Sequence, residues 1–203
     1  MTSPFGTRRR RNQRGQAMLE FAILVPAFMI VLFGMLEFGF AFSHHLTLEY
    51  ATREGARMGA ALANGTAEVA CGPVTATNDL DAYIIAAVQR VLLGAGGQIP
   101  IAQVKEIHIY KSDSVGAEGS TNIWIPGAGP TVELVPLQFK RSGATNWDPC
   151  SRTNVSGNVD SLGVSLIYDY QYITPLGNLM RMTGAPQLRI SDRTIMALNP
   201  GAN

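Results

Sequence analysis

The sequence predicts an α+β protein in which a long N-terminal helix is followed by a second helix and an antiparallel sheet. Three observations support this. Residues 21–36 form an apolar run without a charge. Residues 80–92 carry apolar side chains at helical spacing, and from residue 105 onward apolar and polar residues alternate instead. Helices that precede a series of strands in the chain are typical of α+β folds with an antiparallel sheet.

The composition indicates one ordinary domain with an apolar anchor. The chain has 203 residues, of which 46% are hydrophobic and only 15% are charged. Five arginines and no acid precede residue 16, so the remainder holds 11 basic and 15 acidic residues. A mildly acidic body does not fit a nucleic-acid-binding protein, which would carry a clustered basic face.

The basic leader and the first helix predict a membrane topology. Residues 16–42 are long enough and apolar enough to cross a bilayer, which takes about 20 residues. Arginines in front of a first span hold that end in the cytoplasm. We therefore expect a leader at 1–15, a membrane helix with an extracytoplasmic extension at 16–63, and an extracytoplasmic α+β domain at 64–203. The protein would cross the cytoplasmic (inner) membrane once.

The leader itself can be of several kinds. Its apolar core is too long for a secretory signal peptide, and no small-x-small cleavage site follows. A twin-arginine signal would have apolar residues soon after the arginine pair, whereas Arg10-Arg11 is followed by the polar Asn12 and Gln13. The leader is similar instead to that of type IV prepilins, which is short and basic and ends in glycine before an apolar helix with glutamate at the fifth position. Gly15, Gln16 and Glu20 fit this pattern.

The segment RGQAMLEFAILVPAFMIVLFGMLEFG at 14–39, followed by ATREGARMGA at 51–60, resembles the TadE family of pseudopilins from tight-adherence (Flp) pilus systems. The matching positions are Arg14-Gly15-Gln16-Ala17, Glu20-Phe21, Pro26, Phe33-Gly34, Glu37-Phe38-Gly39 and Arg53-Glu54-Gly55-Ala56-Arg57. They cover about a quarter of the chain. The remainder is similar to the family only in outline, as a pilin-like domain with strands after a long helix.

The resemblance implies a function and a set of partners. A prepilin peptidase would cleave on the cytoplasmic side between Gly15 and Gln16. The mature protein would be a minor pseudopilin that promotes assembly of a type IV pilus, either as a part of the surface fibre or only by priming its assembly. The pilus system links it to cell adhesion and secretion. Its partners would be the lipid bilayer, the peptidase, other pilin and pseudopilin subunits and the assembly machinery. No cofactor or enzymatic activity is implied.

Two glutamates interrupt the apolar helix, and an ionised carboxylate there is costly enough to suggest a function. Cleavage after Gly15 creates an amino group at Gln16, four residues before Glu20 and on the same helix face. Glu20 can therefore pair with the amino terminus of its own or a neighbouring subunit, which lowers the burial cost of both charges. Glu37 lies roughly 25 Å further along the axis. It would be an interfacial acid facing water, or a contact between subunits.

The extension of the first helix carries two expected ion pairs. Glu49 and Arg53 are four residues apart in the favourable order, and Glu54 can reach Arg57. Such pairs are typical of a solvated helix face. The match of Arg53, Glu54 and Arg57 to the family makes an interaction surface the alternative interpretation.

The domain is expected to contain one further helix and several strands. The helix begins after Asn78 as N-cap and ends at Gly94. Expected strands lie at 105–110, at 135–139 through Val135, Leu137 and Phe139, at 164–172 and at 188–198. Loops are expected at 113–130 and 141–162. The short apolar segment 176–182 is interpreted as core, with a membrane or partner contact as the alternative.

The two cysteines, Cys71 and Cys150, are permitted to form a disulfide if the domain is exported. Closing a loop of about 80 residues would contribute roughly 4 kcal/mol. Two buried thiols or an intermolecular bond are the alternatives.

No catalytic, cofactor-binding or metal-binding pattern emerges. His44, His45 and His108 lack partners at metal-ligand spacing and are interpreted as ordinary surface or interfacial residues. The glycines at 94–97 lack the Lys-Ser or Lys-Thr of a phosphate-binding loop. The alternative to a pseudopilin is a membrane-anchored extracytoplasmic hydrolase or ligand-binding domain with an uncleaved anchor.

Overall fold

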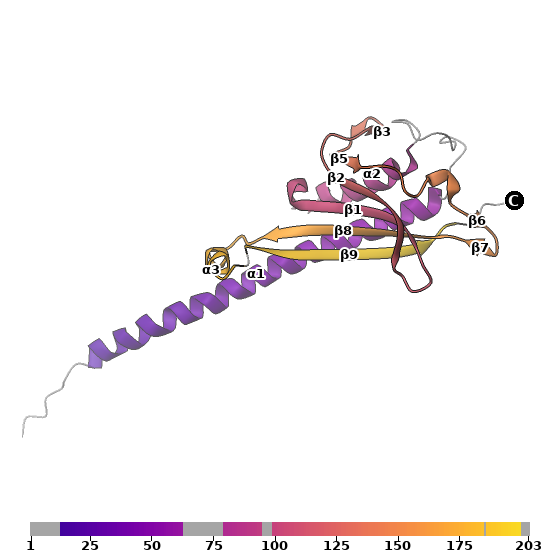
Figure 1. Cartoon of the computed structure of the whole chain (residues 1–203). Helices are drawn as coiled ribbons and strands as arrows, with labels where there is room; N and C mark the ends of the chain where they lie inside the picture. Colours follow the sequence, from indigo (N-terminus) through magenta and orange to yellow (C-terminus); the bar gives the residue numbers. More distant parts are fainter. Residues whose placement is uncertain (1–12, 63–78, 95–98, 185, 200–203) are drawn as a thin grey trace, which may run out of the picture.

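The computed structural model describes residues 13–62, 79–94, 99–184 and 186–199, and these form three helices and a five-stranded sheet. Helix α1 (Gln13–Leu62) is a single helix of 50 residues. Helix α2 (Leu80–Leu93) and the short α3 (Leu176–Met182) follow. The predicted α+β class, with a long apolar N-terminal helix ahead of an antiparallel sheet, is therefore confirmed (Figure 1).

The main sheet is antiparallel, with strand order β5-β2-β1-β8-β9. Its strands are β1 (Val104–Ser112), β2 (Glu118–Pro126), β5 (Phe139–Ser142), β8 (Ser161–Gln171) and β9 (Gln187–Ala197). Two small hairpins, β3 (Thr131–Val132) with β4 (Val135–Pro136) and β6 (Asn154–Val155) with β7 (Asn158–Val159), lie outside it. Two 3-10 turns, η1 (Ile101–Gln103) and η2 (Pro149–Ser151), complete the elements.

The C-terminal half of α1 lies along the sheet, in contact with β8, β9 and α2 (Figure 1). Strand β8 supplies the centre of the core, because its alternating apolar and aromatic side chains are fully buried. Those side chains are Leu162, Val164, Leu166, Tyr168 and Tyr170. They meet the apolar stripe of α2, which includes Ile84, Val88 and Leu92. The predicted period-two pattern of β8 and period-3.6 pattern of α2 are both confirmed.

The N-cap of α2 differs from the expected residue. The cap is Asp79, whose carboxylate accepts a hydrogen bond from the Asp81 N–H at 3.1 Å, and Asn78 lies outside the described residues. Either side chain is a favourable N-cap, so propensity alone does not separate neighbours. Gly94 follows the last helical residue, as expected.

Two assignments were wrong: residues 113–130 as a loop, and residues 135–139 as one strand. Strand β2 occupies much of the expected loop 113–130; its first half is polar, and one of its core-facing residues is Asn122, so it lacks an apolar alternation. Val135 and Phe139 belong to separate strands, β4 and β5. Between them the Leu137 N–H donates to the Pro130 carbonyl, which breaks the strand. The expected loop 141–162 holds η2 and the β6–β7 hairpin.

The interpretation of segment 176–182 as core was also wrong. Within α3 only Gly177 is buried, and Leu179 and Met182 are exposed. The segment packs beside α1 at one end of the domain instead of under the sheet (Figure 1).

Candidate functional site: the apolar helix and its attachment to the domain

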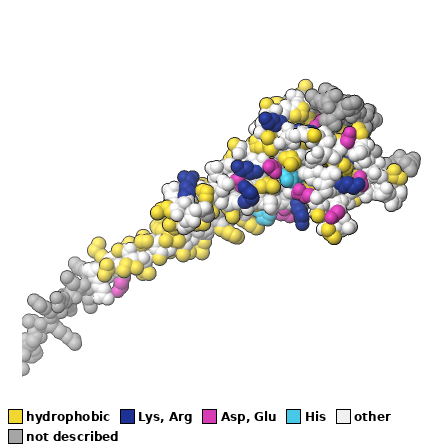
Figure 2. Space-filling model, viewed as in Figure 1, with side chains coloured by type: hydrophobic (Ala, Val, Ile, Leu, Met, Phe, Trp, Pro, Cys, Tyr) yellow, Lys and Arg dark blue, Asp and Glu magenta, His cyan; other side chains and the backbone are white. Residues whose placement is uncertain are grey.

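The N-terminal half of α1, residues 15–36, projects from the domain, and none of its residues is buried (Figures 1 and 2). Its large apolar side chains, among them Phe21, Leu24 and Phe28, are exposed. The part of α1 that the structure describes is long enough and apolar enough to cross a membrane, and its most apolar stretch is 0% buried. A soluble protein would bury such a surface, so the helix suggests anchoring in a membrane by a single pass.

Gly15, Gln16 and Glu20 lie together at the start of this free half. A Cβ atom at Gly15 would meet no other atom within 4 Å, so the backbone there is open to a large partner. The Gln16 Nε2 donates a hydrogen bond to the Glu20 Oε1 at 3.1 Å. The structure thus brings residue 16 and the Glu20 carboxylate to one helix face. Peptide cleavage after Gly15 and pairing of Glu20 between subunits stay predictions.

Glu37 marks the point where α1 meets the domain. Its side chain is only 5% exposed, so the interpretation as an acid facing water was wrong. The carboxylate accepts hydrogen bonds from the Tyr170 hydroxyl and from the backbone N–H groups of Ile173 and Thr174, the latter two at 2.9 Å. Hydrogen bonds to an ionised carboxylate are about twice as strong as neutral ones. Glu37 therefore fastens the helix to the end of β8; a role between subunits stays a prediction.

His44 makes the next contact between α1 and β8. Its ring is buried within the domain, contrary to its interpretation as an ordinary surface or interfacial residue. The ring lies 5.7 Å from the Tyr168 ring and 5.2 Å from the Tyr170 ring, centroid to centroid. Burial lowers the pKa of His44, which favours the neutral ring over the charged one. Because the Tyr168 hydroxyl donates to Gln103, the His44 Nδ1–H suits the remaining 3.1 Å contact to that hydroxyl oxygen.

Gly55 and Gly59 allow α1 to approach the domain closely. A Cβ atom at Gly55 would lie 2.6 Å from the Val88 Cγ2 of α2, and one at Gly59 would lie 2.8 Å from the Leu162 Cδ2 of β8. Their spacing of four places both on one face of the helix. Sequence reasoning considered such glycine spacing only at Gly34 and Gly39, where the structure has nothing within 4 Å. The usable signal, two glycines four residues apart, lay within the segment ATREGARMGA at 51–60.

The charged residues of the same motif point away from the domain. The expected ion pairs Glu49–Arg53 and Glu54–Arg57 both form, and both arginines are exposed. On the opposite face the buried Thr52 hydroxyl contacts the Asp192 carboxylate and the Thr194 hydroxyl of β9. One face of this segment therefore docks on the domain, and the opposite face carries exposed charged residues. Whether Arg53, Glu54 and Arg57 bind a partner is a prediction.

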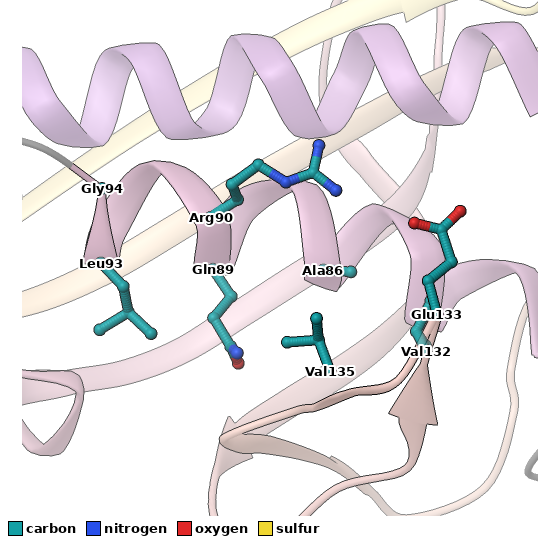
Figure 3. Close-up of a pocket in the computed structure, with 8 residues that line it drawn as sticks. All are labelled: Ala86, Gln89, Arg90, Leu93, Gly94, Val132, Glu133 and Val135. Atoms are coloured by element: carbon teal, nitrogen blue, oxygen red, sulfur yellow. The ribbon is translucent and has the colours of Figure 1, made fainter.

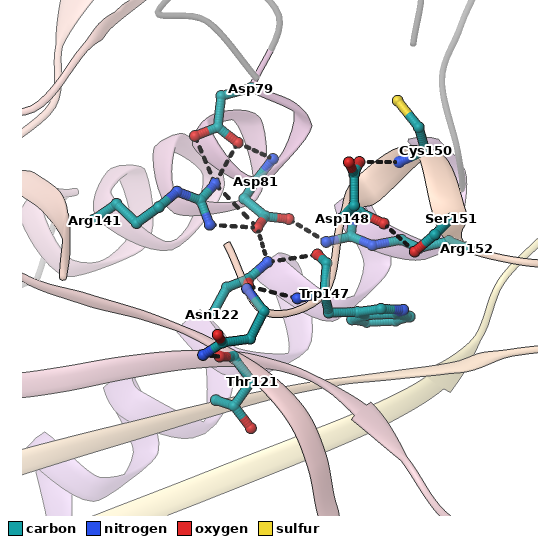
Figure 4. A network of polar contacts seen from close by, with 11 residues as sticks. Asp79, Asp81, Thr121, Asn122, Arg141, Trp147, Asp148, Cys150, Ser151 and Arg152 are labelled. Atoms are coloured by element: carbon teal, nitrogen blue, oxygen red, sulfur yellow. Dashed lines mark hydrogen bonds and ion pairs between the residues drawn. The ribbon is translucent and has the colours of Figure 1, made fainter. Parts of the chain in front are cut away.

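A network of charged side chains joins the start of α2 to the loop that carries Cys150 (Figure 4). Asp81 is fully buried and pairs with Arg141 and Arg152, while Asp79 pairs with Arg141 at 2.6 Å. Burial and the adjacent Asp81 charge raise the pKa of Asp79, against the lowering effect of Arg141. Two acids and two bases balance, which suits a structural network.

Cys150 lies in η2, next to this network, and its N–H donates to the Asp148 carboxylate at 2.8 Å (Figure 4). Cys71 lies outside the described residues. The Cys71–Cys150 disulfide therefore stays a prediction.

A shallow pocket of about 340 Å³ lies between α2 and the β3–β4 hairpin (Figure 3). Its lining residues are Ala86, Gln89, Arg90, Leu93, Gly94, Val132, Glu133 and Val135. Arg90 and Glu133 are the charged groups among them, and no nucleophile or histidine accompanies them. Among the residues that the structure describes, no group of three or more His, Cys, Asp or Glu side chains is arranged to hold a metal ion.

The fold and the free helix define a class of protein: an α+β domain carried on one long apolar N-terminal helix that is suited to membrane anchoring. The family model described as TadE-like protein matches residues 15–57, which confirms the resemblance. The match begins at Gly15, runs through the free half of α1 and ends within the docked half at Arg57. No curated protein and no solved structure matches the chain.

Proposed function

We propose that this protein is a minor pseudopilin needed for assembly of a tight-adherence pilus. A prepilin peptidase removes residues 1–15, the helix from Gln16 anchors the protein in the inner membrane, and the domain at 64–203 lies outside the cytoplasm. Its partners are the peptidase, the other pilin and pseudopilin subunits and the assembly machinery.

One observation carries the proposal: the TadE-like match begins at Gly15 and covers the exposed apolar half of α1. The residues that a processed pilin helix requires lie at the start of that half, with Gln16 and Glu20 on one face. Such a helix has an uncovered apolar surface with an acid at its N-terminal edge, which suits lateral packing against identical or related helices in a bilayer or fibre.

Intact-mass measurement of the membrane-extracted protein tests the processing step. We expect a mature chain that begins at Gln16 in cells that hold the peptidase, and a full-length chain in cells that lack it. Gly15→Leu is expected to leave the precursor intact, because the peptidase must bring its catalytic groups close to the backbone.

Gly34→Leu is the matched control for that experiment. It adds the same side chain to a glycine of the free helix where nothing lies within 4 Å, and we expect normal cleavage. A mature wild-type chain that still begins at Met1 would contradict the prepilin assignment.

A reporter fused after Asn203 tests the topology. It is expected to be active only outside the cytoplasm, and replacement of the five leader arginines is expected to weaken that orientation. A cytoplasmic reporter would contradict both the orientation and the disulfide prediction.

A further inference from the structure

Residues 172–184, which include α3, lie at the end of the domain nearest to the free half of α1 (Figure 1). Helix α3 contacts α1 directly. The Glu37 carboxylate holds this segment at a fixed height on the helix, since it accepts hydrogen bonds from the N–H groups of Ile173 and Thr174. The position of the segment along α1 is therefore determined by the fold.

The segment exposes large apolar side chains that the domain does not use. Ile173 is 59% exposed, Leu179 47% and Met182 85%. On α1 itself, Phe38 and Phe42 are also exposed, with stacked rings whose centroids lie 6.2 Å apart. In Figure 2 hydrophobic side chains run along the free helix and continue over α3. A contiguous apolar surface of this kind marks a contact with something outside the domain.

The height of the segment matches the edge of a bilayer. Residues 17–36 span about 30 Å as a helix, which is the thickness of the hydrocarbon layer. Residue 37 then falls at the boundary between acyl chains and headgroups. Ile173 and Thr174, whose N–H groups bond to Glu37, fall at the same level, and α3 follows directly after them. Arg181, in the last turn of α3, is exposed and adds a positive charge where phosphate groups lie.

We propose that residues 173–182 form a second membrane contact, separate from the spanning helix. Ile173, Leu179 and Met182 enter the boundary between headgroups and acyl chains of the leaflet on the side of the domain, and Arg181 lies among the phosphates. Two points of attachment, α1 and α3, fix the tilt of the domain on the bilayer. The proposal rests on the proposed function in one respect: the free half of α1 must span the membrane.

The structure favours lipid as the occupant of this surface. The α3 surface is continuous with the apolar surface of the spanning helix, and it combines apolar side chains with a basic one, as interfacial helices do. A neighbouring subunit is the competing occupant, and the experiment below separates the two.

Quenching of tryptophan fluorescence by brominated lipids tests the contact in the full-length protein. Three single variants are reconstituted in vesicles of phosphatidylcholine and phosphatidylglycerol: Met182→Trp at the proposed contact, Met29→Trp in the spanning helix and Val115→Trp as the matched control. Val115 is 84% exposed and lies in the β1–β2 turn, beyond the end of β8 opposite to α3. Trp124 and Trp147 are buried and give the same background in all variants.

We expect strong quenching of Trp at position 182 by lipids brominated near the headgroup, and of Trp at position 29 by lipids brominated deeper in the chain. The Val115→Trp protein is expected to show no more quenching by either brominated lipid than the parent protein does. Quenching at position 29 without quenching at 182 overturns the second contact and leaves the anchoring intact. Absence of quenching at both positions contradicts the assignment of the free half of α1 as a membrane-spanning helix, and with it the proposed function. Blue-shifted but unquenched emission at 182 indicates coverage by protein and overturns the lipid assignment.

Discussion

The two halves of α1 are one continuous helix, yet they meet different surroundings. Residues 17–36 expose apolar side chains in all directions. Residues 37–62 bury one face, along which Glu37, His44, Leu48, Ala51, Gly55 and Gly59 follow at helical spacing. The free half is suited to lipid, whereas the docked half uses small and polar residues to fit a specific protein surface. Secondary structure alone does not distinguish the halves; their partners do.

Glu20 and Glu37 show the difference most clearly. Glu20 is exposed and bonds to Gln16 within its own helix. Glu37 is buried and bonds to residues 133 to 137 positions away in the chain. One glutamate, Glu20, is therefore free to bind an external partner, whereas the other, Glu37, is bonded within the fold. Substitutions in the docked half are therefore expected to lower the stability of the domain, and substitutions in the free half are not.

Gly55→Leu is expected to have the largest effect. A side chain there collides with Val88, which is β-branched and cannot easily move aside, so we expect a loss of about 3 kcal/mol or a failure to fold. Chemical denaturation in detergent, followed through the fluorescence of Trp124 and Trp147, measures it. Gly34→Leu in the free half is the control and is expected to unfold as the parent does. Equal stability of the two variants would contradict the docking of α1 through Gly55.

Glu37→Ala is expected to cost about 2 kcal/mol, because it leaves the buried Tyr170 hydroxyl and two partly buried N–H groups without an acceptor. The loss is expected to be local, so hydrogen exchange at the Ile173 and Thr174 amides is the most direct measurement. Tyr170→Phe removes one of the three donors and is expected to show a smaller increase in exchange. Unchanged exchange at both amides in Glu37→Ala would rule out the attachment described here.

His44 and His108 are expected to give opposite pH dependences. Burial lowers the pKa of His44 in the folded state. Its contribution to stability is therefore fully present above the unfolded pKa and is lost as the pH falls from the unfolded pKa through the folded pKa. For His108 burial lowers the pKa, but hydrogen bonds to and charges of Glu106 and Glu118 outweigh it and raise the pKa overall. Its contribution is present below the unfolded pKa and is lost as the pH rises through the folded pKa.

Unfolding midpoints between pH 5 and 8 measure this. His108→Gln leaves the His44 dependence, so stability is expected to fall more steeply on acidification than in the parent. His44→Gln leaves the His108 dependence and is expected to have the opposite effect on the slope. Parallel pH profiles in the two variants would contradict these environments.

Glu20→Ala is expected to leave domain stability unchanged, because Glu20 contacts only its own helix. If the proposed function holds, it removes the partner of an amino terminus in a membrane and impairs packing beside other pilins. Co-purification with those pilins and pilus number per cell, at equal membrane abundance, measure the effect. Normal values in both assays would reduce Glu20 to a recognition mark for the peptidase or a tolerated interfacial acid.

Much of the fold was predictable because it is written in short-range patterns. The apolar run of α1, the stripe of α2 and the alternation of β8 each follow from neighbouring residues, and each was confirmed. Strand β2 was missed because its polar first half and its buried Asn122 depend on distant partners. The Asn122 side chain donates to Asp81, 41 positions away, and to the Trp147 carbonyl, and it accepts from the Asn146 and Trp147 N–H groups. These distant partners together make a buried amide acceptable.

The sequence by itself determined the apolar helix, its length relative to a bilayer, the placing of two helices ahead of an antiparallel sheet, and the TadE-like character of residues 15–57. Only the tertiary structure decided where that helix stops being free, because the boundary is set by contacts between residues far apart. Glu37 meets the end of β8, Gly55 and Gly59 meet α2 and β8, and α3 turns outward instead of into the core. Periodicity reports which face of an element is apolar, but the geometry of packing decides what that face touches.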